Sequence, residues 1–117
     1  LTQVMSTNAG GGSATRGLSA GGLNPGDSAG INVTSYVTIA STGDATDFGD
    51  LTVARYIVGG GASNSLRLVF AGGKSPGDDT VMDYFTIATT GNALDFGDNT
   101  GAGGRSYGFS DSHGGLE

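Results

Sequence analysis

Val33 to Asp50 reads VTSYVTIASTGDATDFGD, and the chain repeats this stretch from Val81 to Asp98 as VMDYFTIATTGNALDFGD. The offset is 48 residues (33 to 81), and 12 of the 18 aligned positions are identical. A period of this length, built from short alternating apolar segments, is typical of a repeated four-stranded unit that buries its faces against copies of itself. The sequence therefore predicts an all-β repeat fold.

The repeat extends beyond this stretch on its N-terminal side. Leu1-Thr2 aligns with Leu51-Thr52, and residues 8–27 align with residues 58–78. Segments rich in β-branched and aromatic residues, separated by Gly-containing turns, predict four strands in each copy. We expect them near 4–7, 16–20, 35–40 and 45–48 in the first copy, at 54–58, 66–71, 83–88 and 93–96 in the second, and one further strand at 105–110.

These strands define the expected domain organisation. We expect a single repeat domain over residues 1–115, followed by a cloning scar at residues 116–117. Within the domain, the boundaries are about 1–50 for the first repeat, 51–98 for the second and 99–115 for a partial third.

Composition excludes several classes of protein. Gly is 24 of 117 residues, which predicts many turns and close backbone contacts, and only 14% of residues are charged, too few for a typical disordered segment. The net charge of −6 argues against a nucleic-acid partner, which requires a basic surface. With no Cys, the chain has no disulfide or thiolate metal site. No apolar run is long enough to span a membrane, so we expect no membrane insertion.

The repeat resembles the kelch-type β-propeller repeat. The features that carry the resemblance are an Arg that opens a strand, a strand that ends in Gly-Gly, a Tyr in the next strand and an aromatic residue in the fourth. They are found at Arg55 and Arg105, at Gly21-Gly22 and Gly72-Gly73, at Tyr36 and Tyr84, and at Phe48 and Phe96. The phrase around TIATTGNALDFGD is similar to divergent kelch-like repeats of marine bacteriophage and environmental sequences. It departs from ordinary kelch repeats in having Phe where Trp is usual.

The resemblance implies about two four-stranded propeller blades and one extra strand in each chain. The side chains expected to pack within and between blades are Tyr36, Ile39, Phe48, Tyr84, Ile87 and Phe96. Closed propellers have about four to eight blades, so two blades cannot close a ring. We therefore expect a homo-oligomer that completes the ring, with a trimer favoured over a dimer or a tetramer.

Three acidic residues are the only metal candidates. Asp44, Asp47 and Asp50 recur at every third position, and clustered carboxylates can bind Ca²⁺. Their spacing fits no known calcium loop, and Asp also caps turns by accepting hydrogen bonds from nearby backbone N–H groups. Turn capping is the favoured interpretation, with calcium binding as the alternative, and no cofactor is expected.

Aromatic and basic residues provide the other candidates. Tyr56, Tyr107 and Phe109 could stack on a sugar ring, although core packing or a subunit contact is the favoured interpretation. Arg55, Arg67 and Arg105 are expected to bond across strands or to neighbouring Asp residues rather than to bind an anionic ligand. His113 is the only His and has no catalytic pattern around it. We therefore expect no enzymatic activity.

These expectations combine into one function with one alternative. We expect a non-enzymatic β-propeller scaffold that self-assembles into a closed ring and has a structural or adhesive role, such as a component of a phage tail fibre or virion surface. The alternative is a carbohydrate-binding, lectin-like propeller module whose partner is a surface glycan. Both favour a virion or extracellular location.

Overall fold

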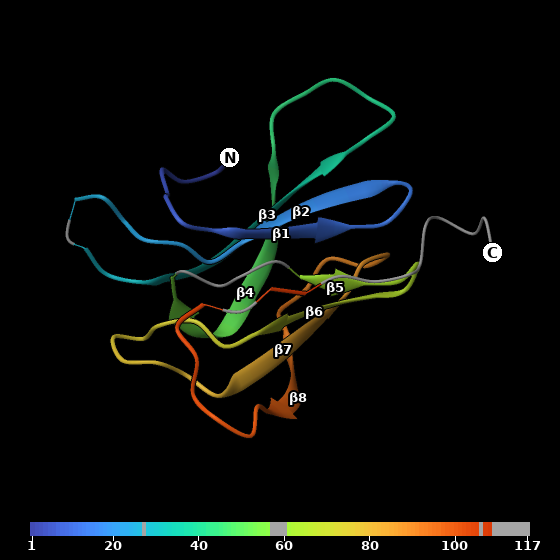
Figure 1. Cartoon of the computed structure of the whole chain (residues 1–117). Coiled ribbons are helices and arrows are strands. Elements are labelled where there is room, and N and C mark those ends of the chain that lie inside the picture. The colour runs from blue at the N-terminus through green and yellow to red at the C-terminus, as the bar shows by residue number, and fades with distance from the viewer. Residues whose placement is uncertain (27, 57–60, 106, 109–117) are drawn as a thin grey trace.

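The computed structural model describes residues 1–26, 28–56, 61–105 and 107–108, and in these residues the protein is all-β. The strands form two four-stranded antiparallel sheets, in which each strand pairs with the next along the chain. Figure 1 shows the two sheets one above the other. The first contains β1 (Ala9–Gly12), β2 (Arg16–Ala20), β3 (Ile31–Thr38) and β4 (Thr46–Arg55); the second contains β5 (Ala62–Ser63), β6 (Arg67–Ala71), β7 (Val81–Thr86) and β8 (Leu94–Asp98).

The sequence repeat is also a structural repeat. β3 and β7 are rich in β-branched and aromatic residues, which favour the pleated, half-buried surface of a sheet. β2 pairs with β3 from Arg16–Thr38 onward, and β6 pairs with β7 from Arg67–Thr86 onward, so the register is the same in both copies. The prediction of two four-stranded units is therefore confirmed.

The core lies between the two sheets. Phe48 of β4 is 2% exposed, and its ring meets the ring of Phe85 of β7 edge to face at a centroid distance of 5.5 Å. Leu68 and Phe70 of β6 are fully buried in the same cluster. Burial of one such side chain stabilises a fold by about 1.5–3 kcal/mol. The contact between the sheets is thus the main apolar contact of the described chain.

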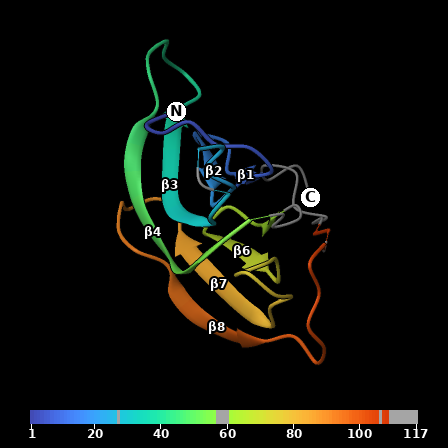
Figure 2. The same ribbon diagram turned by 90° about the vertical axis from the view of Figure 1, so that its left-hand side faces the viewer.

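Glycine allows the two sheets to approach closely. Gly49, in β4, has a φ of +142°, and a Cβ there would overlap the backbone of Gly91. A Cβ at Gly11, in β1, would overlap the side chain of Leu68. Figure 2 shows the result on one side of the molecule, where the loop between β7 and β8 lies beside β4.

The expected strands at 4–7 and 54–58 are not separate strands: residues 4–7 form one isolated bridge at Ser6, and Ala54 and Arg55 are the end of β4. β4 runs as one strand from Thr46 to Arg55, past Phe48, where we expected the strand to end, because positive φ at Gly49 bends the strand without ending it. The first strand of each sheet is instead glycine-rich (β1) or very short (β5). Ile57 and Val58 lie outside the described residues.

The expected ninth strand at 105–110 is also absent from the residues described there. Arg105, Tyr107 and Gly108 belong to no strand, while Ser106, Phe109 and Ser110 lie outside the described residues. Residues 105–110 contain one Gly, Gly108, and Gly101, Gly103 and Gly104 come directly before them. Each Gly costs backbone entropy in a strand. Within the described ranges, no helix has the length and apolar character needed to cross a membrane.

Candidate functional site

The contact between the sheets, which we call the internal interface, shows how one repeat recognises the next. On the first sheet it is formed by Phe48 and Leu51, which are 2% and 3% exposed. On the second sheet it is formed by Phe85 and Ile87, which are 2% and 1% exposed. Because the two sides come from different positions of the repeat, the interface is heterologous, and each sheet has a second face of the opposite kind.

Main-chain hydrogen bonds fix the internal interface in register. The N–H of Gly91 donates to the carbonyl of Phe48 at 2.7 Å, and the N–H of Ala93 donates to the carbonyl of Asp50 at 2.8 Å. The N–H of Asp50 donates to Oδ1 of Asn92 at 3.0 Å. The loop between β7 and β8 therefore adds to the outer strand of the first sheet almost as another strand does.

A buried ion pair completes the internal interface. Nη2 of Arg55 lies 2.8 Å from Oδ2 of Asp83, and both side chains are 0% exposed. Nη1 of Arg55 also donates to the carbonyl of Val81 at 3.2 Å, and the hydroxyl and N–H of Thr52 donate to the Asp83 carboxylate. Burial lowers the pKa of Arg55, and the Asp83 charge opposes this shift.

The expectation that Arg55 bonds across strands or to an Asp is confirmed, but sequence reasoning did not find its partner. Asp83 aligns with Ser35 in the first repeat, and this difference within an otherwise similar strand was the available signal. A carboxylate that is buried in one repeat requires a counter-charge, whereas the hydroxyl at the equivalent position of the other repeat does not.

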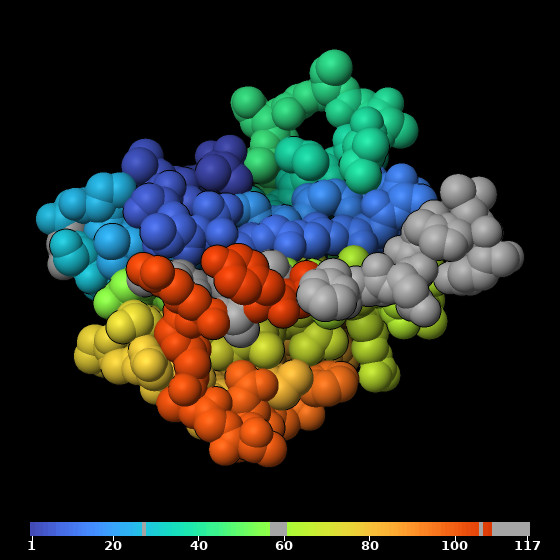
Figure 3. Space-filling view, in the orientation of Figure 1, coloured from blue at the N-terminus to red at the C-terminus, as the bar shows by residue number. Residues whose placement is uncertain are grey.

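Two further faces are open, and they are the repeat equivalents of the buried ones. We call Val37, Ile39 and residues 43–45 the open face of the first sheet; Val37 and Ile39 are 41% and 59% exposed, whereas their equivalents Phe85 and Ile87 are buried. Figures 1 and 3 show the loop between β3 and β4, which includes residues 43–45, projecting from the first sheet.

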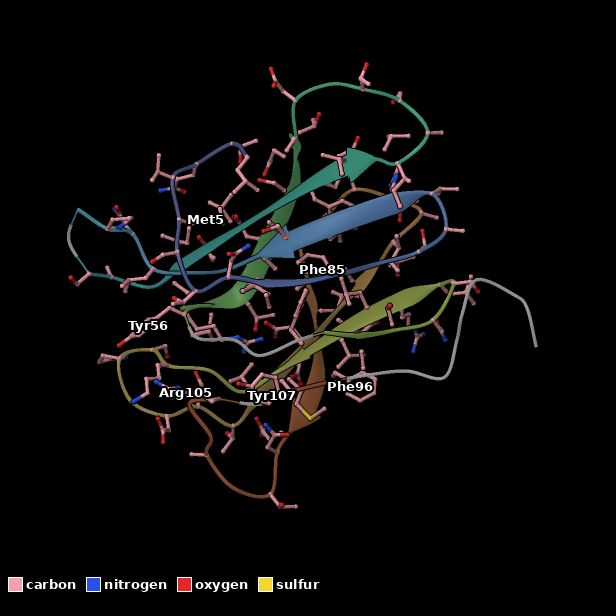
Figure 4. The ribbon with its side chains drawn as sticks, turned by 45° about the horizontal axis from the view of Figure 1, so that its top comes forward. Met5, Tyr56, Phe85, Phe96, Arg105 and Tyr107 are labelled. Atoms are coloured by element: carbon pink, nitrogen blue, oxygen red, sulfur yellow. The ribbon has the colours of Figure 1, made fainter. Side chains whose placement is uncertain are left out.

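The open face of the second sheet consists of Leu94, Phe96 and Asp98. Leu94 is 57% exposed and Phe96 is 51% exposed, whereas Phe48, the equivalent of Phe96, is buried. Figure 4 shows Phe85 between the sheets and Phe96 out on the second sheet. The expected burial of Phe96 and Ile39 is therefore wrong for a single chain, because each lacks the neighbouring repeat that covers its equivalent.

The remaining expected core residues are buried to different degrees. Phe48 and Ile87 are buried, as expected. Tyr36 and Tyr84 are half-buried, and each lies under an Arg guanidinium, that of Arg16 or Arg67, at 4.8 Å from the ring centroid. A guanidinium over an aromatic face is attracted by the ring quadrupole, so the two tyrosines anchor equivalent cation–π contacts.

The N-terminal segment covers part of the first sheet. Thr2 contacts Ser35 through its hydroxyl at 2.7 Å and its N–H at 3.4 Å, in the way that Thr52 contacts Asp83. Ser6 and Leu23 exchange backbone hydrogen bonds, as Tyr56 and Lys74 do. Residues 1–5 therefore occupy the position on the first sheet that residues 51–55 occupy on the second.

The calcium candidates lie along one edge. Asp44 is in the loop before β4, and Asp47 and Asp50 lie within β4. Among the residues that the structure describes, no group of three or more His, Asp or Glu side chains is placed to hold a metal ion. Oδ1 of Asp95, the repeat equivalent of Asp47, accepts a hydrogen bond from the N–H of Gly97 within β8 at 3.2 Å.

The aromatic candidates do not form one surface. Tyr56 lines a shallow depression with Lys74, Asp78, Gly104 and Arg105, whereas Tyr107 is 83% exposed and does not line it. Figure 4 shows Tyr56 and Arg105 on the same side of the molecule. Phe109, the third candidate, lies outside the described residues.

Comparisons with known proteins add no assignment. A scan against protein-family models found no match, and a search of curated proteins found none.

Proposed function

We propose that this protein is a non-enzymatic scaffold of the kelch-like β-propeller type whose copies associate head to tail into a closed ring. Its role would be structural or adhesive, as in a phage tail fibre or another component of a virion surface. With two blades per chain and about four to eight blades in closed propellers, two to four copies complete a ring, and three is the expected number.

One observation carries this proposal: the two open faces are the repeat equivalents of two faces that already bind each other. Phe96 is 51% exposed where Phe48 is 2% exposed, and Ile39 is 59% exposed where Ile87 is 1% exposed. Apolar patches at both ends of a stack favour association over solvent exposure. Since the two end faces are of opposite kind, association is heterologous and can close only as a ring.

A charged substitution on one open face tests the proposal. Phe96→Asp places a carboxylate where apolar packing is proposed, so the variant should sediment as a monomer while the wild type sediments as a larger discrete species. Leu66→Asp is the control, because Leu66 is 66% exposed in the turn before β6, away from both open faces. A monomeric wild type at micromolar concentration, or an unchanged Phe96→Asp variant, contradicts the proposal.

Carbohydrate binding is the second candidate function, and the depression beside Tyr56 favours it. The aromatic ring lies near the ion pair between Lys74 and Asp78, whose Nζ and Oδ1 are 3.3 Å apart, and near Arg105. A sugar is held by such a combination of a ring face and polar groups. A glycan array should then give a signal that Tyr56→Ala removes; an array without signal contradicts this function.

A further inference from the structure

We infer that a second copy of this chain docks on the open face of the first sheet by laying its strand β8 along residues 43–45. This inference rests on the proposed function and assigns its contacts. In the docked pair, the N–H groups of Gly43 and Ala45 of one copy donate to the carbonyls of Phe96 and Asp98 of the other.

The internal interface is the template for these bonds. Gly43 and Ala45 align with Gly91 and Ala93, whose N–H groups donate across the internal interface. In the part of the chain that the structure describes, the N–H groups of Gly43 and Ala45 have no hydrogen-bond partner. The N–H groups of Gly43 and Ala45 are two residues apart, as those of Gly91 and Ala93 are. They therefore match a strand that presents carbonyl acceptors at alternate residues.

The accepting strand has the required form. β8 is the outer strand of its sheet among the described strands, as β4 is in the first sheet. Phe96 is skipped in the pairing of β8 with β7, as Phe48 is skipped in the pairing of β4 with β3. Gly97 has a φ of +136°, close to the +142° of Gly49, so the bend that lets the loop approach β4 is also present in β8.

The open faces carry no charged side chain at either position of the buried ion pair. In the internal interface Asp83 has the counter-charge of Arg55. On the open faces, Ser35 stands in the place of Asp83, and Gly103 stands in the place of Arg55. The backbone shows this equivalence, because the carbonyl of Gly103 accepts from Gly73 at 2.9 Å as that of Arg55 accepts from Gly22 at 2.9 Å. At the position of the ion pair, docking therefore buries no unpaired charge.

Docking also requires the N-terminal segment to move. In the internal interface, residues 51–55 lie against the second sheet. Both residues 1–5 of one copy and residues 99–103 of the incoming copy align with residues 51–55. The two segments therefore cannot occupy the same position on the first sheet together. Before Ser6, the N-terminal segment is held by the N–H and hydroxyl of Thr2, which contact Ser35, and by the sulfur of Met5, which accepts from the Ser19 hydroxyl at 4.0 Å. The incoming copy therefore displaces residues 1–5 from the sheet.

Cysteine cross-linking tests the register, because the native chain contains no Cys. Asp44 and Asp98 are the equivalents of Asn92 and Asp50, which lie in contact across the internal interface. Asp44→Cys and Asp98→Cys are prepared as separate variants and mixed, then oxidised or treated with a short bismaleimide. The chain with both Asp50→Cys and Asn92→Cys is the control, and it should link within one molecule.

The expected result is a covalent dimer in the mixture and none in either variant alone. A chain with both Asp44→Cys and Asp98→Cys should then give a ladder whose largest member counts the copies in the ring. Linking of either single variant with itself overturns the inference, and so does a mixture that fails to link while the control links. Sedimentation of the wild type is measured separately. A wild type that self-associates while the mixed variants fail to link associates in another register, and a monomeric wild type does not associate at all.

Discussion

At the scale of single residues, the ion pair between Arg55 and Asp83 is the contact that most restricts the sequence. Both side chains are fully buried, and among the described residues Nε of Arg55 has no partner. Removing one member of a buried pair leaves an uncompensated charge, whereas replacing both members by uncharged residues is often nearly neutral. The first repeat has Met5 and Ser35 at the aligned positions, so the chain contains its own uncharged version of the contact.

This comparison predicts a strongly coupled double-mutant cycle. Asp83→Ser alone should lower the free energy of unfolding by about 3–5 kcal/mol, because Arg55 stays buried without its counter-charge. Adding Arg55→Met should restore most of the loss. Urea unfolding of the wild type, both single variants and the double variant measures the coupling. Additive losses in the double variant are the result that contradicts a charge-pair role.

Asp79 predicts a dependence of stability on acid. Burial acts to raise its pKa, but hydrogen bonds from the N–H of Val81 and the hydroxyl of Ser75, both at 3.0 Å, leave the pKa below its ordinary value. A lowered folded-state pKa contributes stability that is present above the unfolded-state value of about 3.9 and is lost as pH falls through the folded-state pKa.

The matched variant is Asp79→Asn, which keeps a side-chain acceptor and does not titrate. The stability advantage of the wild type over this variant should be largest near neutral pH and should shrink below about pH 4. Urea midpoints of both proteins across this range measure it. An advantage that stays constant with pH would show that the carboxylate charge contributes nothing.

At the scale of elements, the loop between β3 and β4 differs from its repeat equivalent in partners more than in sequence. The loop between β7 and β8 hydrogen-bonds along β4, whereas residues 43–45 project from the first sheet (Figure 2). A proline removes a backbone donor and leaves most of a loop unchanged, so it can separate the main-chain bonds from the apolar packing.

Ala45→Pro should therefore weaken association, because it removes the N–H that we assign to the carbonyl of Asp98. Thr42→Pro is the control: its equivalent, Thr90, makes no cross-sheet bond among the described contacts. Sedimentation equilibrium gives the association constant of each variant, and thermal melting checks that the fold is kept. Equal effects of the two prolines would mean that the donor of Ala45 is not used.

The inner strands of each sheet could be predicted from the sequence, whereas the first strand of each sheet could not. Alternating apolar residues predict β2, β3, β6 and β7 well, because these strands lie inside their sheets and their pattern reflects their own burial. The first strand of each sheet was misplaced, since β1 is Gly-rich, with low strand propensity, and β5 is only 2 residues long. Gly11 has no side chain, and this lets β1 lie against Leu68 of the second sheet.

At the scale of the whole molecule, the sequence predicts the number of repeats but not which faces are covered. Phe48 and Phe96 belong to the same DFGD phrase, yet one is buried and the other is half exposed. The exposure of this Phe side chain depends on whether a neighbouring repeat covers it, and the local sequence pattern does not indicate whether one does. The two sheets together expose two apolar open faces, and each is the repeat equivalent of one side of the internal interface.

Native mass spectrometry of the full chain shows whether its copies close head to tail into a ring. We expect one species at a small whole-number multiple of 11.5 kDa, with three copies expected and a stoichiometry that does not change as protein concentration is raised. A closed ring has no free face left to add another copy, so its mass stays fixed. A folded 11.5 kDa monomer at micromolar concentration, or a series of masses that lengthens with concentration, contradicts ring closure.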